Sequence, residues 1–101
     1  MPRDNDHQRS YLDDIPTGKT YGISRSNLSI IWSVDERKVS AIIADLRNQG
    51  EIIASSNAGY YLPANDDELA EYYRIQRRRA LSILKTLKMT SRALKSAGIP
   101  V

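Results

Sequence analysis

The spacing of apolar residues in the middle of the chain predicts two consecutive amphipathic helices. The first follows the candidate N-caps Ser24 and Ser26 and runs through Trp32. The second is capped by Asp35 and runs to Gln49, where Gly50 ends it in a left-handed conformation. The positions expected to face inward are Leu28, Ile31, Trp32, Val39, Ile42, Ile43 and Leu46.

A short helix is predicted before this pair, and a β-hairpin after it. Ser10–Ile15 has the pattern of a short helix, which Pro16 and the following Thr-Gly turn bring to an end. After Gly50 the pattern changes to β-branched and aromatic runs at residues 51–55 and 60–62, separated by a turn at 56–59.

A long helix is predicted from Asn65 or Asp66 to about Ser96, because a capping residue and acidic first turn precede a coiled-coil repeat. Such a helix is about 45 Å long, whereas a body of about 65 residues has a radius of gyration near 11 Å. Most of it therefore needs another surface, and a two-fold partner is the simplest. The repeat comprises Leu69, Tyr73, Gln76, Ala80, Ile83, Leu87, Thr90 and Leu94, and its apolar members are the candidate dimerisation residues.

These elements predict a mainly α fold with a small β-hairpin, namely a winged helix-turn-helix followed by a long C-terminal helix. Three segments follow: residues 1–9 as a disordered N-terminus, 10–64 as the winged-helix domain, and 65–101 as a long basic helix for dimerisation. This architecture is defined by three helices, of which the last two are joined by a tight turn, and by a hairpin that follows them.

The stretch from Ile15 to Pro63, about half of the chain, resembles small winged-helix proteins of phages and prophages of Gram-positive bacteria. The matching segments are IPTG at 15–18, DLRNQG at 45–50, SS at 55–56 and GYYL at 59–62. The resemblance implies a DNA-binding protein that acts in transcription or replication control in the cytoplasm of a bacterial host. It also implies that the third helix enters the major groove.

The outward face of the third helix has side chains that suit a groove. Arg37 can bond guanine, Asn48 can pair with adenine, and alanines let the backbone approach the bases closely. Residues at the start of the second helix and in the wing can add phosphate contacts. The candidate DNA-binding residues are Arg25, Ser26, Arg37, Lys38, Ser40, Ala41, Asn48 and Asn57. The competing interpretation is an ordinary solvated helix face.

Charge is divided unevenly along the chain, whose net charge is +3. Residues 1–73 contain all twelve acids and seven bases, whereas the remainder has eight bases and no acid. The basic stripe comprises Arg74, Arg78, Lys85, Lys88, Arg92 and Lys95. It can face DNA, the acidic body of a neighbouring subunit, or only solvent. The acidic balance of the first part favours an alternative function, a protein-interaction module that inhibits a host replication or defence enzyme.

Composition argues against catalysis, metals, cofactors and membranes. The chain has no Cys, a single His at position 7, and no apolar run long enough for a membrane span. Its adjacent carboxylates, such as Asp13 with Asp14, occur at expected helix ends, where capping explains them. We therefore expect a cytoplasmic, non-enzymatic protein without cofactor or metal. Its expected partners are double-stranded DNA and a second copy of itself, with an acidic or DNA-binding host protein as a further candidate.

Overall fold

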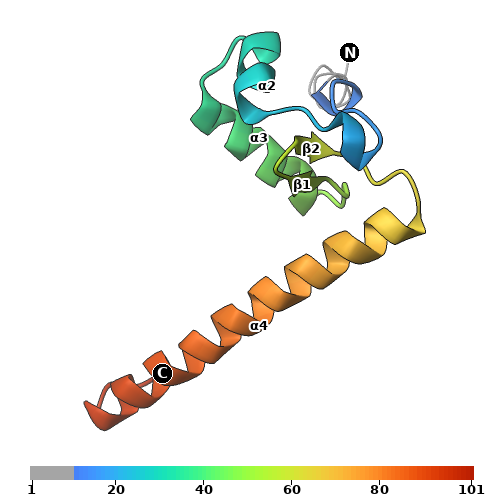
Figure 1. Cartoon of the computed structure of the whole chain (residues 1–101). Helices are drawn as coiled ribbons and strands as arrows, with labels where there is room; N and C mark the ends of the chain where they lie inside the picture. The colour runs from blue at the N-terminus through green and yellow to red at the C-terminus, as the bar shows by residue number, and fades with distance from the viewer. Residues whose placement is uncertain (1–10) are drawn as a thin grey trace. The chain divides into compact units, whose positions relative to one another are not determined.

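The computed structural model describes residues 11–101, so the segment 1–9, expected to be disordered, lies outside the described residues. The chain forms an N-terminal unit that ends at Leu69 and a C-terminal unit, Ala70–Val101. The predicted fold class, mainly helical with a small hairpin and a long C-terminal helix, is confirmed (Figure 1). The elements are η1 (Lys19–Tyr21), α2 (Arg25–Trp32), α3 (Glu36–Asn48), β1 (Ala54–Ser56), β2 (Gly59–Tyr61) and α4 (Asp66–Ser96).

The core of the N-terminal unit lies between α2, α3 and the segment leading into β1. Its buried members are Ile15, Leu28, Val39, Ile42, Ile43, Leu46 and Ile53. All four predicted inward positions of α3 are buried. In α2 the prediction for Ile31 is wrong, because this side chain is 52% exposed. An eight-residue helix buries only a narrow stripe, and here Leu28 and Trp32 occupy it.

Trp32 also connects α2 to the first helical segment. Residues 11–13 are helical, which agrees with the described part of the predicted short helix. The indole Nε1 of Trp32 donates a hydrogen bond to Asp14 at 2.8 Å, and its ring lies 4.8 Å from that of Tyr11. This contact holds the segment before η1 against the core.

Capping residues set the ends of α2 and α3 as the sequence predicts. Ser24 and Asp35 each accept a hydrogen bond from the backbone N–H three residues further on, at 3.0 and 2.7 Å. Gly50, with φ of 105°, follows the end of α3. The turn between the helices contains Ser33 at φ 54°, the one non-glycine residue of 11–101 with a positive φ.

The hairpin is tighter than predicted. β1 and β2 pair antiparallel, and Ser56 pairs with Gly59, which leaves a two-residue turn between them. The expected strands at 51–55 and 60–62 therefore have wrong boundaries. Residues 51–53 lie outside the strands because no partner strand faces them. Residues 57 and 58 are sufficient to form the turn, so the two strands extend to residues 56 and 59 on either side of it.

A single residue before α2 acts as a third strand of the hairpin. Ile23 and Tyr60 exchange two backbone hydrogen bonds, of 2.9 and 2.8 Å. Gly59 lies against the Ile23 carbonyl with φ of 121°, and a Cβ there would collide with that backbone. The part of β2 next to the turn is thus attached to the start of α2.

The short helix η1 was not predicted, and its attachment explains why the N-terminal unit includes the first turn of α4. The Lys19 N–H lies 3.2 Å from both carboxylate oxygens of Glu68, and Oε1 accepts a second bond, from the Ala64 N–H, at 2.9 Å. Asn65 Oδ1 accepts a bond from the Glu68 N–H at 2.9 Å, so Asn65 is the N-cap of α4.

The helix α4 is continuous over 31 residues, in agreement with its predicted bounds. Its C-terminal end is closed by Gly98 at φ 75° and by a bond from the Ile99 N–H to the Leu94 carbonyl at 2.9 Å. Neither α4 nor any other helix within residues 11–101 has the length and apolar character that crossing a membrane requires.

Candidate nucleic-acid interface

The outward face of α3 is the candidate interface. Arg37, Lys38, Ala41 and Asn48 are exposed, and Ser40 is half-buried, while the opposite side of the same helix is in the core. The Asp35 cap fixes the first turn of α3, so the two basic side chains start from an ordered backbone. The face presents a cation, an amide and a small side chain along one helix, which is a set that can contact base edges.

The structure brings Arg25 from the start of α2 onto this same face, through two contacts with α3. Its Nε lies 3.2 Å from Glu36 Oε1, and its Nη1 donates to Ser40 Oγ at 3.3 Å. The side chains of Arg25 and Glu36 are 53% and 52% exposed. An ion pair this exposed contributes about 0–1 kcal/mol, so the guanidinium is engaged but readily exchanges its partner. The contact of Glu36 with Arg25 was not predicted from the sequence.

Ser26 and Asn57, the remaining candidates, lie in the first turn of α2 and in the hairpin turn. Both are exposed, and neither side chain makes a hydrogen bond to another described residue. The hairpin turn is instead supported by Ser56 Oγ, which accepts from the Ala58 N–H at 3.1 Å. The hairpin turn thus offers polar groups and no cation.

Another base of α3, Arg47, has a structural role. Its Nε donates to the Ile53 carbonyl at 2.9 Å, and its guanidinium lies 5.9 Å from the centre of the Tyr60 ring. It holds the chain leading into β1 and is half-buried.

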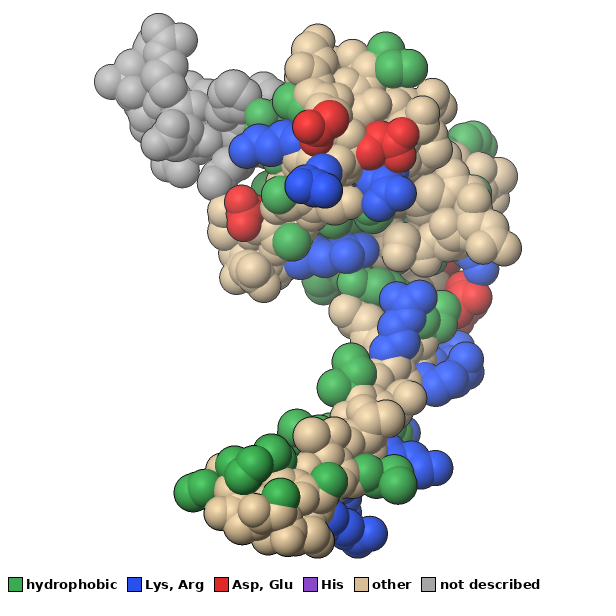
Figure 2. Space-filling view, turned by 90° about the vertical axis from the view of Figure 1, so that its left-hand side faces the viewer, with side chains coloured by type: hydrophobic (Ala, Val, Ile, Leu, Met, Phe, Trp, Pro, Cys, Tyr) green, Lys and Arg blue, Asp and Glu red, His purple; other side chains and the backbone are tan. Residues whose placement is uncertain are grey.

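On the face of the N-terminal unit seen in Figure 2, acidic and basic side chains are interspersed.

Helix α4 carries two features, the basic stripe and the predicted dimerisation residues. The basic stripe residues are all exposed, and none forms a hydrogen bond or ion pair with another residue of the described chain. Among the predicted dimerisation residues, Tyr73, Ile83 and Leu87 are 61%, 66% and 59% exposed. Of the others, Leu69 and Ala80 are also exposed, and Leu94 is half-buried.

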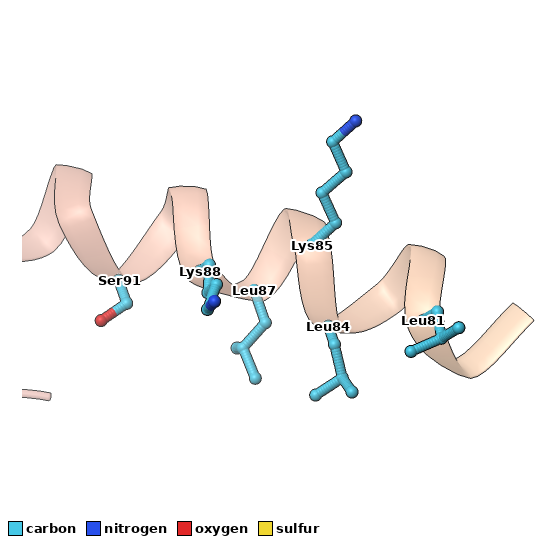
Figure 3. A pocket seen from close by; sticks show the side chains of 6 residues that line it. All are labelled: Leu81, Leu84, Lys85, Leu87, Lys88 and Ser91. Carbon is cyan, nitrogen blue, oxygen red and sulfur yellow. The ribbon is translucent and has the colours of Figure 1, made fainter.

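The apolar surface of α4 is wider than predicted. Leu81 and Leu84, which were not assigned to it, are 48% and 54% exposed. They line a shallow hollow along the helix together with Leu87, Lys85, Lys88 and Ser91 (Figure 3). Leu84 and Leu87 point to one side of the helix and Lys85 to the other. A helical wheel drawn for every leucine would have identified Leu84, which lies beside the repeat rather than in it.

Within residues 11–101, no cluster of three or more His, Asp or Glu side chains is placed to hold a metal ion. Comparisons with protein-family models, with curated proteins and with solved structures find no match to this chain. The site must therefore be interpreted from its own residues.

Proposed function

We propose that the protein is a dimeric winged-helix DNA-binding protein of a phage or other mobile element, which acts in transcription or replication control. The observation that carries the proposal is the exposed polar face of α3, which follows α2 after a three-residue turn and precedes a hairpin. This order is that of a winged helix-turn-helix, whose second helix of the pair enters the major groove. The sequence resemblance of residues 15–63 supplies the phage context and the cytoplasmic location.

In this proposal α3 contacts base edges and the surrounding residues hold phosphates. Arg37 and Lys38 lie in the first two turns of α3, the part of a recognition helix that approaches the bases. Asn48 is at the far end of the helix, and Ala41 lets the backbone come close. Pairing through α4 supplies a second copy of this surface, as two half-sites require. The role is binding, with no catalytic step.

The test is a gel-shift titration of the protein against duplexes from its own genome and of random sequence, at about 50 and 200 mM salt. If Arg37→Ala with Lys38→Ala removes two phosphate contacts, the slope of log affinity against log salt falls by about 2. If either side chain contacts a base, discrimination between own and random DNA also drops by about 1–3 kcal/mol.

The matched control is Arg78→Ala with Lys85→Ala, which makes the same charge change on two exposed residues of the basic stripe of α4. We expect this variant to keep the discrimination between own and random DNA, because the basic stripe lies on a different element. Equal affinity and salt slope in the α3 variant and the parent protein would remove α3 from the interface. Equal effects of both variants would assign the binding to general charge instead.

A second candidate function is a protein-interaction module that inhibits a host replication or defence enzyme. The observation in its favour is that Glu36 holds Arg25 on the candidate DNA face, in a segment rich in acids. A carboxylate there repels phosphate and suits a basic protein surface. If no duplex is shifted even at about 50 mM salt, where phosphate contacts are strongest, and a host replication or defence enzyme is retained in a pull-down, the second function is favoured over the first.

A further inference from the structure

The apolar repeat of α4, which we call the seam, is an exposed surface with no partner among the described residues. It consists of Leu69, Tyr73, Gln76, Ala80, Ile83, Leu87, Thr90 and Leu94. Because α4 is unbroken from Asp66 to Ser96, these positions form one stripe along the helix. Large apolar side chains that are 59–66% exposed on such a stripe mark a surface that binds a partner.

We propose that a second copy of α4 covers the seam in antiparallel orientation, with Ala80 of one chain opposite Ile83 of the other across the two-fold axis. This inference rests on the homodimer of the proposed function and is independent of DNA binding. It fixes the direction of the two helices, which the repeat alone leaves open.

Side-chain size is the first reason for the antiparallel direction. In this register Ala80, the smallest residue of the seam, lies against the β-branched Ile83, and this contact occurs twice about the axis. In a parallel pair Ala80 faces Ala80, which leaves a gap, while Tyr73 faces Tyr73. Interiors pack to high density, so layers that combine small with large side chains are favoured.

The polar seam residues are compatible with the antiparallel direction, because each already donates a hydrogen bond within its own helix. Gln76 Nε2 donates to Tyr72 Oη at 2.9 Å, and Thr90 Oγ1 donates to the Thr86 carbonyl at 2.9 Å. In the antiparallel register Gln76 lies against Leu87 and Thr90 against Tyr73. The Gln76–Tyr72 and Thr90–Thr86 bonds can remain in place there, as they can in a parallel pair, so these residues permit the antiparallel direction without selecting it.

The distribution of charge along α4 is the second reason. Acids occur only near its start, including Asp66, Asp67 and Glu71, whereas Arg92 and Lys95 lie near its end. Antiparallel pairing places each acidic start beside a basic end, while parallel pairing places like charges together. Arg92 and Lys95 belong to the basic stripe on the outer face, so the preference is a long-range attraction between helix ends and requires no ion pairs across the seam.

The surroundings of the seam agree with this arrangement. Leu84 flanks the seam and, in the antiparallel register, lies opposite position 77 of the other chain, where the aliphatic stem of Arg77 can cover it. Lys85 points away from Leu84 and Leu87 in Figure 3, so pairing leaves it in solvent. The basic stripe thus stays available on the outside of the pair.

The absence of cysteine from the sequence permits a direct test by single thiols. Tyr73→Cys and Thr90→Cys are oxidised separately and then as a mixture in which one variant carries a tag that changes its mass. In the antiparallel pair the two thiols at position 73 are about 26 Å apart along the helix, whereas a disulfide needs Cα atoms within about 7 Å. We therefore expect a disulfide between the two variants in the mixture and none in either variant alone.

The pair Gln76→Cys and Leu87→Cys repeats the test at another layer, so that a substitution that weakens pairing is recognised. Arg78→Cys, on the outer face, is the control and should remain unlinked. Disulfides within single variants would show parallel helices and overturn the proposal. A monomer at tens of micromolar in sedimentation would also overturn the proposal. A protein that is monomeric and binds vesicles of anionic lipid would overturn it in the same way. All of these measurements omit DNA, so they leave the contact between α3 and DNA to the gel-shift titration. Parallel helices would overturn the direction alone, whereas a monomer would also remove the homodimer from the proposed function.

Discussion

The carboxylate of Glu68 provides the sharpest test of how the N-terminal unit is held together. It accepts hydrogen bonds from two backbone N–H groups, those of Lys19 at the start of η1 and of Ala64 before α4. These donors are far apart in sequence, and the first is half-buried. Glu68→Ala removes the acceptor and leaves both groups to find water.

The expected cost follows from the two bonds. A hydrogen bond to a charged group contributes about 1.5–3 kcal/mol, and an exposed donor such as the Ala64 N–H recovers most of this from water. We therefore expect Glu68→Ala to lower the free energy of unfolding by about 2–3 kcal/mol, and Glu68→Gln, which keeps one acceptor oxygen, by about 1 kcal/mol. With a urea dependence of about 1–2 kcal/mol/M, the alanine variant shifts the midpoint by at least about 1 M.

The assay is urea unfolding followed by fluorescence of Trp32, the single tryptophan, which packs against the core of this unit. Asp67→Ala is the control, since it removes a neighbouring exposed carboxylate that has no partner among the described residues. It should cost only the helix-dipole contribution, about 0.3–1 kcal/mol. If Glu68→Ala and Asp67→Ala have the same effect, the bonds to Lys19 and Ala64 do not hold η1.

Two further predictions concern backbone conformation and use the same unfolding assay. Gly59→Ala should lose about 3 kcal/mol or more, because its Cβ meets the Ile23 backbone at a positive φ, whereas the control Gly50→Ala, with φ of 105° and open space around it, should lose only about 1–2 kcal/mol. Equal losses at both positions would mean that the close approach at Gly59 is relaxed in solution. Ser33→Gly should raise stability by about 0.5–1 kcal/mol, because the left-handed conformation at φ 54° is costly for serine; an unchanged or lower midpoint would contradict this strain.

Features decided within a few residues were predictable from the sequence. The inward face of α3 follows from its period, and Asp35, Gly50 and Asn65 are local signals that mark helix ends. The long α4 was equally clear, because its repeat continues over many turns. The outward side of α3 was then defined by elimination, so the placement of Arg37 and Asn48 was predictable as well.

Features that depend on contacts distant in sequence were not predictable. The bond between Lys19 and Glu68 joins residues 49 positions apart, and nothing local marks η1 or its partner. The contact of Arg25 with Glu36 depends on the angle between α2 and α3, which the turn at Ser33 sets. For Ile31, two neighbouring positions satisfy the same period, and only packing chooses between them.

The attachment of the hairpin at Ile23 bears on the thermodynamics of any ligand that touches both the turn and the start of α2. Two backbone bonds and a glycine contact make these segments one rigid piece, and the turn between the strands has only two residues. Such a surface loses little conformational entropy when it is occupied. Differences in affinity among ligands should then report the quality of their contacts, with little contribution from ordering a loose loop.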